Sequence, residues 1–160
     1  MQDAVERVIV AHHAAGKEFE AGGVRSFVRA QGEGDPIVLF HGIPASSYLY
    51  RKVIPLLAAR GFRALAFDLP GLGFAGRPVN FDYTFSGLGR WAAAAVDALG
   101  LTRFHLVVHD AGGPVGFEMA ATMPARICSL TLLNTVVDLD AAPFAMEFYA
   151  RFATGEHWPA

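Results

Sequence analysis

The stretch that decides the fold lies in the second half of the chain and reads Val107-Val108-His109-Asp110-Ala111-Gly112-Gly113-Pro114-Val115-Gly116. Before it, the apolar run Phe104–Val108 predicts a strand, and after it Gly116–Met123 predicts a helix. A strand that passes into a helix through a cluster of small residues lifts one side chain above the edge of a sheet. In this stretch that side chain belongs to Asp110.

The residues around Asp110 allow the sharply bent backbone that such a turn needs. Ala111, Gly112 and Gly113 leave room for the helix to pack close behind the strand. With His109 they give the layout of a nucleophile elbow, in which Asp110 holds the place of the serine in the Gly-x-Ser-x-Gly motif. The N–H groups in the first turn of the helix would stabilise its negative charge. We interpret Asp110 as a nucleophile, with an ordinary helix N-cap as the alternative.

A carboxylate nucleophile favours one class of reaction. It attacks saturated carbon, displaces halide or opens an epoxide, and gives an alkyl-enzyme ester that water must later cleave. Acyl hydrolysis would more naturally use serine or cysteine. The expected substrate is therefore a small apolar halide or epoxide.

The second chemically informative stretch is His41-Gly42-Ile43-Pro44-Ala45-Ser46-Ser47. It follows Ile37–Phe40, an all-apolar run that predicts a strand buried on both faces of a parallel sheet. Gly42 allows a tight turn and Pro44 fixes φ, so the N–H of Ile43 can point into a site. With the N–H of Ala111 it would form a two-donor oxyanion hole. The alternative is that this stretch is only a strand-to-helix turn.

The rest of the chain predicts alternating helices and strands. Helices are expected over residues 1–13, 48–60 and 86–99, and a β-hairpin over residues 17–29. The strands expected at the centre of the sheet are Ile37–Phe40, Arg63–Phe67, Phe104–Val108 and Ile127–Leu133. This alternation predicts an α/β fold whose parallel strands are joined by crossover helices.

The composition narrows the classes of protein to which the chain can belong. Its 160 residues, 53% of them hydrophobic, suffice for one domain with a substantial core. The net charge of −2 gives no basic surface for nucleic acid. The single cysteine, Cys128, excludes a disulfide within the chain and predicts a buried thiol. The N-terminus has neither a basic leader nor a membrane-length apolar run, which predicts a cytoplasmic protein. No cofactor or metal site is expected. Gly71-x-Gly73 lacks the spacing of a phosphate-binding loop, which argues against nucleotide binding.

These motifs together resemble the α/β-hydrolase fold and, within it, the Asp-nucleophile branch of haloalkane dehalogenases and epoxide hydrolases. The matching features are His41-Gly42-x-Pro44, Ser47-Tyr48-Leu49-Tyr50-Arg51-Lys52, Asp68-x-Pro70-Gly71-x-Gly73 and Val108-His109-Asp110-x-Gly112-Gly113. The resemblance implies a mostly parallel sheet with flanking helices. Residues 1–17 are expected to be an N-terminal extension, residues 18–135 the N-terminal part of the hydrolase core, and residues 136–160 the beginning of a lid region.

Two departures from the family pattern concern the leaving group. Dehalogenases of this kind usually carry Trp after the nucleophile, and one common second halide donor is Asn two places after the oxyanion His. Here these positions are Ala111 and Ile43, which have no side-chain donor. A lost charge-assisted hydrogen bond costs about 1.5–3 kcal/mol. The departures count less against epoxide opening, in which lid tyrosines protonate the oxygen.

The resemblance also implies parts that follow the sixth strand: a completed lid, two further strands, an acid and a catalytic His. The chain ends at Ala160, so it is expected to be truncated before them, with Asn134 where some relatives place the acid and His157 as the remaining candidate base. The expected behaviour is alkylation of Asp110 without turnover. The alternative is a catalytically dead module or gene fragment that associates with another chain through its sheet edge and uncovered apolar surface.

Overall fold

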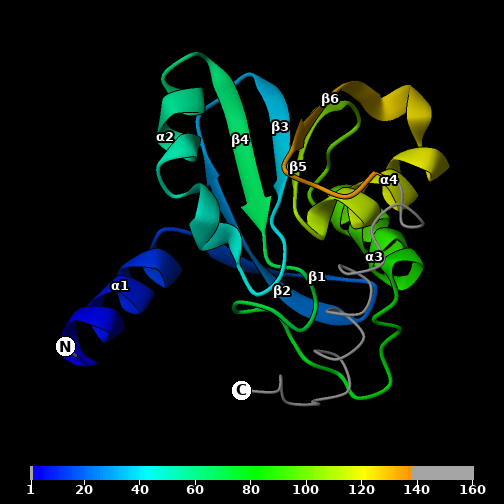
Figure 1. The fold of residues 1–160 in the computed structure, drawn as a ribbon. Coiled ribbons are helices and arrows are strands. Elements are labelled where there is room, and N and C mark those ends of the chain that lie inside the picture. The colour runs from blue at the N-terminus through cyan, green and yellow to red at the C-terminus, as the bar shows by residue number, and fades with distance from the viewer. Residues whose placement is uncertain (1, 138–160) are drawn as a thin grey trace.

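Six strands form one sheet in the order β1-β2-β4-β3-β5-β6 (Figure 1). The structure, a computed structural model, describes residues 2–137. The strands are β1 (Lys17–Ala21), β2 (Val24–Gln31), β3 (Asp35–Phe40), β4 (Phe62–Phe67), β5 (Phe104–His109) and β6 (Ile127–Leu133). β3 pairs in parallel with β4 and β5, and β5 with β6, whereas the hairpin β1–β2 joins β4 antiparallel. The predicted α/β fold with a mostly parallel sheet is confirmed.

Helices cover both faces of the sheet. They are α1 (Gln2–Ala14), α2 (Val53–Ala58), α3 (Phe85–Ala98) and α4 (Gly112–Thr122), with 3-10 turns η1 (Ser47–Tyr50) and η2 (Pro124–Arg126). In Figure 1, α2 lies on one face, while α3 and α4 lie together on the other. None of the helices within residues 2–137 is long and apolar enough to cross a lipid bilayer.

The alternation of side chains along β3 divides the core between the two faces. Val38 and Phe40 pack in the larger cluster under α3 and α4, whereas Ile37 and Leu39 pack in the smaller cluster under α2. All four are buried. A strand covered on both faces has no polar side to show, which explains the unbroken apolar run in the sequence.

Two helix boundaries differ from the prediction. The helix expected over residues 48–60 is broken into η1 and α2, because Pro55 has no N–H to donate to the carbonyl of Arg51 and is tolerated only in the first turn of a new helix. The helix expected from Gly116 already begins at Gly112. Pro114 is compatible with that earlier start, since the first N–H groups of a helix have no partner within it.

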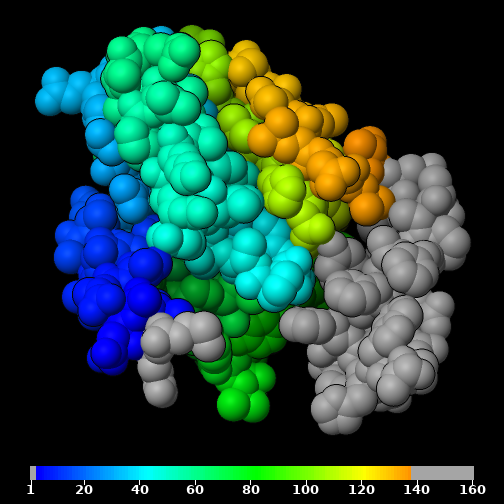
Figure 2. Space-filling view, turned by 60° about the vertical axis from the view of Figure 1, so that its left-hand side comes forward, coloured from blue at the N-terminus to red at the C-terminus, as the bar shows by residue number. Residues whose placement is uncertain are grey.

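The position of β6 was predicted wrongly. It forms the predicted strand, but it lies at the edge of the sheet as the described residues build it, and most of its residues are exposed. Cys128 is therefore exposed and not a buried thiol. Figure 2 shows β6, in orange, at the surface beside the teal α2. Leu133, which lines a groove with Val53 and Leu57 of α2, is 42% exposed, so apolar surface remains uncovered on this side.

The N-terminal helix packs through a different residue from the one its pattern suggests. Val5, Val8 and Ile9 have helical spacing, yet they are 56%, 43% and 49% exposed. The buried residue of α1 is His12, in its last turn.

Candidate active site

The candidate site lies where the chain reverses direction across the sheet. From β3 the chain moves to β4 on one side, and from β4 it crosses over α3 to β5 on the other side. The loops that leave the carboxyl ends of β3 and β5 therefore diverge from neighbouring strands. Open α/β sheets bind ligands at such a switch point.

A hydrogen bond joins these two loops. The backbone N–H of Ile43, after β3, donates to Oδ1 of Asp110, after β5, over 2.9 Å. Asp110 has φ of +53°, in the left-handed region that residues other than glycine rarely adopt. Such a conformation persists only where surrounding contacts impose it. The side chain of Asp110 is thus aimed at the His41–Ser47 loop.

The backbone of Asp110 is held by the segment that follows β6. Its N–H donates to the carbonyl of Asn134 over 3.3 Å, and its carbonyl accepts from Oγ1 of Thr135 over 2.6 Å. The same carbonyl accepts the N–H of Gly113 over 3.0 Å. The N-cap of α4 is Ala111, whereas the carboxylate of Asp110 reaches across to the other loop. This geometry differs from that of an ordinary Asp N-cap.

Glycines let the loops approach this closely. A Cβ atom on Gly42 would lie 2.1 Å from Oδ1 of Asp110, and one on Gly112 would lie 2.6 Å from the carbonyl oxygen of His41. A Cβ on Gly113 would lie 1.8 Å from Oγ1 of Thr135. Side chains at these positions would push the loops apart, so the small residues noted in the sequence are required by packing.

His41 is a structural part of the loop. It is fully buried, its Nε2 accepts the N–H of Leu69 over 3.1 Å, and its Nδ1 lies 2.9 Å from the carbonyl oxygen of Gly42. Nδ1 must therefore carry the proton and donate it to that carbonyl. Burial lowers the pKa of His41 below its ordinary value of 6.5, which keeps the ring neutral. With both nitrogens engaged, His41 ties the loop to the chain after β4.

The remaining sequence candidates flank this contact. His109 is the last residue of β5, and its Nδ1 is buried without a hydrogen-bond partner within the described part of the chain. Pro44 follows Ile43 through a cis peptide bond. His157 and the lid residues from 138 onward lie outside the residues that the structure describes.

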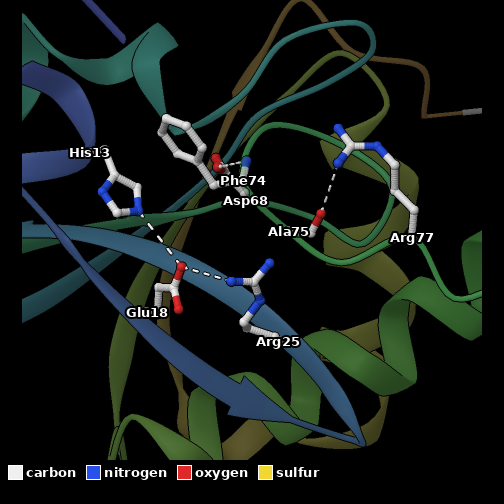
Figure 3. Close-up of polar contacts among 7 residues, drawn as sticks. All are labelled: His13, Glu18, Arg25, Asp68, Phe74, Ala75 and Arg77. Carbon is white, nitrogen blue, oxygen red and sulfur yellow. Dashed lines mark hydrogen bonds and ion pairs between the residues drawn. The ribbon is translucent and has the colours of Figure 1, made fainter. Parts of the chain in front are cut away.

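Sequence reasoning missed the carboxylate that fastens the far end of the loop. Asp68 is fully buried, and its Oδ1 accepts the N–H of Ser47 over 2.6 Å. Its Oδ2 accepts the N–H of Phe74 over 2.7 Å, the contact drawn in Figure 3. Asp68 was noted only as the start of a motif, although a carboxylate directly after a buried strand is a usable signal. Thr135 gave no signal, because its partner is set by the course of the chain after β6.

The described residues offer no group of three or more His, Cys, Asp or Glu side chains that could hold a metal ion. What they bring together is a carboxylate on a bent backbone, a backbone N–H donor and a neutral buried imidazole behind them. Such an arrangement can orient a carboxylate for attack and stabilise negative charge on its oxygen.

Comparisons with known proteins place this geometry in context. A family model for the alpha/beta hydrolase fold matches residues 35–155. A haloalkane dehalogenase of Mycobacterium marinum is 42% identical over 124 residues, which are 76% of this chain and 42% of that protein. The crystal structure of an epoxide hydrolase from Vigna radiata has a TM-score of 0.70 and 33% identity over 73% of this chain and 39% of that one. A haloalkane dehalogenase structure from Agrobacterium tumefaciens C58 has a TM-score of 0.69 and 34% identity, over 75% and 40%. The chain spans less than half the length of each of these proteins.

Proposed function

The chain belongs to the alpha/beta hydrolase fold family, and from this premise we propose that Asp110 is its nucleophile, in a reaction like that of haloalkane dehalogenases or epoxide hydrolases. The observation that carries the proposal is the hydrogen bond from the N–H of Ile43 to Oδ1 of Asp110. It supports a carboxylate held for attack, because it spans two loops at the switch point of the sheet. The similarity to enzymes of both kinds supports the class of reaction.

The proposed step forms one ester bond. A carboxylate oxygen of Asp110 attacks a saturated carbon of a small apolar halide or epoxide. With a halide, the carbon–halogen bond breaks and halide leaves with the electron pair. With an epoxide, a ring carbon–oxygen bond breaks, and the alkoxide takes a proton from water. Both give an alkyl ester on Asp110, in an oxyanion hole to which we assign the N–H groups of Ile43 and Ala111.

The second step needs a water molecule activated against the ester. Among residues 2–137, His41 has both ring nitrogens in hydrogen bonds, and Nδ1 of His109 is shut away from solvent. His105 bonds Ser129 on the face of the sheet that carries α2. General base catalysis contributes about 10²–10⁴-fold. We therefore propose that these residues support alkylation, and that rapid hydrolysis requires a base from elsewhere.

Intact-mass spectrometry tests the proposal. The chain is incubated with a small epoxide or a bromoalkane, and peptide mapping locates the adduct, with Asp110→Asn as the matched control. The expected result is one adduct per chain on Asp110, absent from the control. An adduct that persists in Asp110→Asn, or none in the parent chain with either reagent, would refute Asp110 as the nucleophile. Incubation in H2-18O then reports hydrolysis, because water attack on the ester leaves the heavy oxygen in the carboxylate of Asp110.

A second candidate function is favoured by the uncovered side of the sheet. The exposed Leu133 of β6, together with Val53 and Leu57 of α2, lines an apolar groove that continues over β3 and β5. A module without catalytic activity could associate with another chain through this surface. Alkylation of Asp110 by the monomer favours the enzyme. A stable complex in sedimentation velocity, without alkylation, favours the module.

A further inference from the structure

The N-terminal helix contacts the candidate site region through His12. The helix lies outside residues 35–155, the range that matches the family model. Most of α1 is exposed, yet His12 is only 5% exposed. The contacts of the His12 side chain therefore determine how the N-terminal extension interacts with the rest of the protein.

Two hydrogen bonds fix the protonation state of His12. Its Nδ1 lies 3.3 Å from a guanidinium nitrogen of Arg29, which can only donate, so Nδ1 is the acceptor. The proton of the neutral ring is then on Nε2, which lies 3.0 Å from Oγ of Ser47. His12 therefore donates a hydrogen bond to Ser47.

An aromatic cluster holds the ring of His12 in this position. Its centroid lies 5.3 Å from that of Phe27, 5.0 Å from Tyr48 and 5.9 Å from Phe74. These three rings come from β2, from η1 and from the loop after β4. The position of His12 is therefore set by the folded body and does not depend on the exposed part of α1.

Ser47 closes the loop that carries Ile43. The loop is fastened near its start, where His41 accepts from Leu69, and at its end, where the N–H of Ser47 donates to Asp68. Ser47 is fully buried, and its hydroxyl meets His12 while its N–H meets Asp68. The N-terminal helix thus contributes to one of the two attachments of this loop.

We propose that His12 is a positioning residue, which through Ser47 holds the N–H of Ile43 in place against Asp110. The predicted effect on alkylation rests on the proposed function of Asp110. The contact between His12 and Ser47 does not depend on that function. His12 is hydrogen-bonded to Ser47 and Arg29, and it acts on Asp110 through the loop. The N-terminal extension then helps to position the loop that carries Ile43.

Burial, more than the neighbouring charges, keeps His12 a neutral donor. Burial lowers its pKa below the ordinary value of 6.5, Arg29, Arg51 and His13 act in the same direction, and Asp68 opposes them. The donated hydrogen bond is accordingly present at neutral pH. Protonation would place a cation beside Arg29 and remove the acceptor at Nδ1, so the hydrogen bond from Arg29 would be lost in acid.

Variants of two adjacent histidines separate positioning from packing. His12→Phe keeps a ring in the aromatic cluster but removes the donor, and His12→Gln restores a donor without the ring. His13→Phe is the matched control, since His13 also stacks on Phe27 and contacts Phe74 but turns its Nε2 to Glu18, 3.7 Å away (Figure 3). All are compared by the rate of Asp110 alkylation at saturating reagent.

The expected result is alkylation about two- to tenfold slower in His12→Phe, the effect of one neutral hydrogen bond. His13→Phe should react at the parent rate, and His12→Gln should recover most of the loss. An unchanged rate in His12→Phe, or an equal loss in His13→Phe, overturns the proposal. If His12→Phe does not fold, Ser47→Ala replaces it by removing the acceptor, and the same slowing or its absence decides.

Amide hydrogen exchange separates this proposal from the proposed function. If the parent chain is not alkylated at all, Asp110 is not the nucleophile, yet the contact can still be tested. Faster exchange at Ile43 and Ser47 in His12→Phe than in His13→Phe supports positioning by His12. Equal exchange in the two variants overturns it.

Discussion

Gly42→Ala should displace Asp110 from the His41–Ser47 loop. A Cβ atom at position 42 would lie 2.1 Å from Oδ1 of Asp110 and 2.4 Å from its Cβ. Gly42 is not among the glycines with positive φ, so alanine fits its backbone conformation. The perturbation is therefore the added methyl group, which clashes with Asp110 and separates the two loops.

The size of the effect follows from the distance. Real Cβ contacts essentially never fall below 3.0 Å, so Oδ1 has to retreat by about 0.9 Å. A misplacement of about 1 Å can cost about 10²-fold in rate. Overpacking costs about 1–3 kcal/mol, which for a chain of this length lowers Tm by about 2–12 °C. We expect alkylation of Asp110 to slow about a hundredfold in a protein that still folds.

The assay combines intact-mass kinetics with thermal unfolding of the same sample. Gly76→Ala is the matched control, because a Cβ there would meet its nearest atoms at an ordinary 3.4 Å and its φ is not positive either. Parent-like kinetics and Tm in Gly42→Ala would show that Asp110 does not lie against the loop. A similar loss in Gly76→Ala would show that the effect is not specific to the site.

Three further predictions concern buried polar groups. Asp68→Asn should lower the free energy of unfolding in urea by about 1.5–3 kcal/mol, because the amide nitrogen would face one of two backbone donors that now lie 2.6 and 2.7 Å from the carboxylate; an unchanged midpoint would contradict this. Trp91→Phe removes the indole donor 2.8 Å from the carbonyl of Ala21, and should cost about 1–3 kcal/mol in a thermal melt; a parent-like melt would argue against it. The pKa values of His12 and His41 are lowered by burial. Below pH 6.5 the unfolded chain therefore binds protons that the folded chain does not. The free energy of unfolding should decrease as the pH is lowered from 6.5, until the lowered pKa values are reached. Urea titrations at pH 7.5 and 5.5 check the sign, and His12→Gln should reduce the slope.

The sheet could be predicted from the sequence because burial on both faces leaves an unmistakable pattern. Residues 37–40 of β3 and 64–67 of β4 are covered on two sides, so these runs are apolar throughout. The same pattern could not predict the position of β6 in the strand order, because an apolar run does not show whether other elements cover its faces. The break between η1 and α2 was predictable in principle, because Pro55 stands inside the expected helix.

The candidate site was predictable as far as its residues share a local motif. The contact between Ile43 and Asp110 follows from two loops at the carboxyl ends of neighbouring strands. The contacts of His12 and Thr135 do not follow from any local pattern, because each depends on a partner far away in the sequence. In α1 the apolar spacing marked the face on which His12 also lies, but it did not show that only the last turn of this face is buried, where His12 packs in an aromatic cluster.

The loops after all four parallel strands interlock around Asp110. The loop after β3 donates to its carboxylate, the chain after β4 holds that loop through His41 and Ser47, and the segment after β6 holds its backbone. A substitution that removes one of these contacts should therefore change stability and alkylation together. A substitution in the core that leaves the loops in place, such as Val96→Ala in α3, should lower stability alone. The position of the carboxylate thus depends on the loops at the carboxyl ends of all four parallel strands, and β5 provides only one of these four loops.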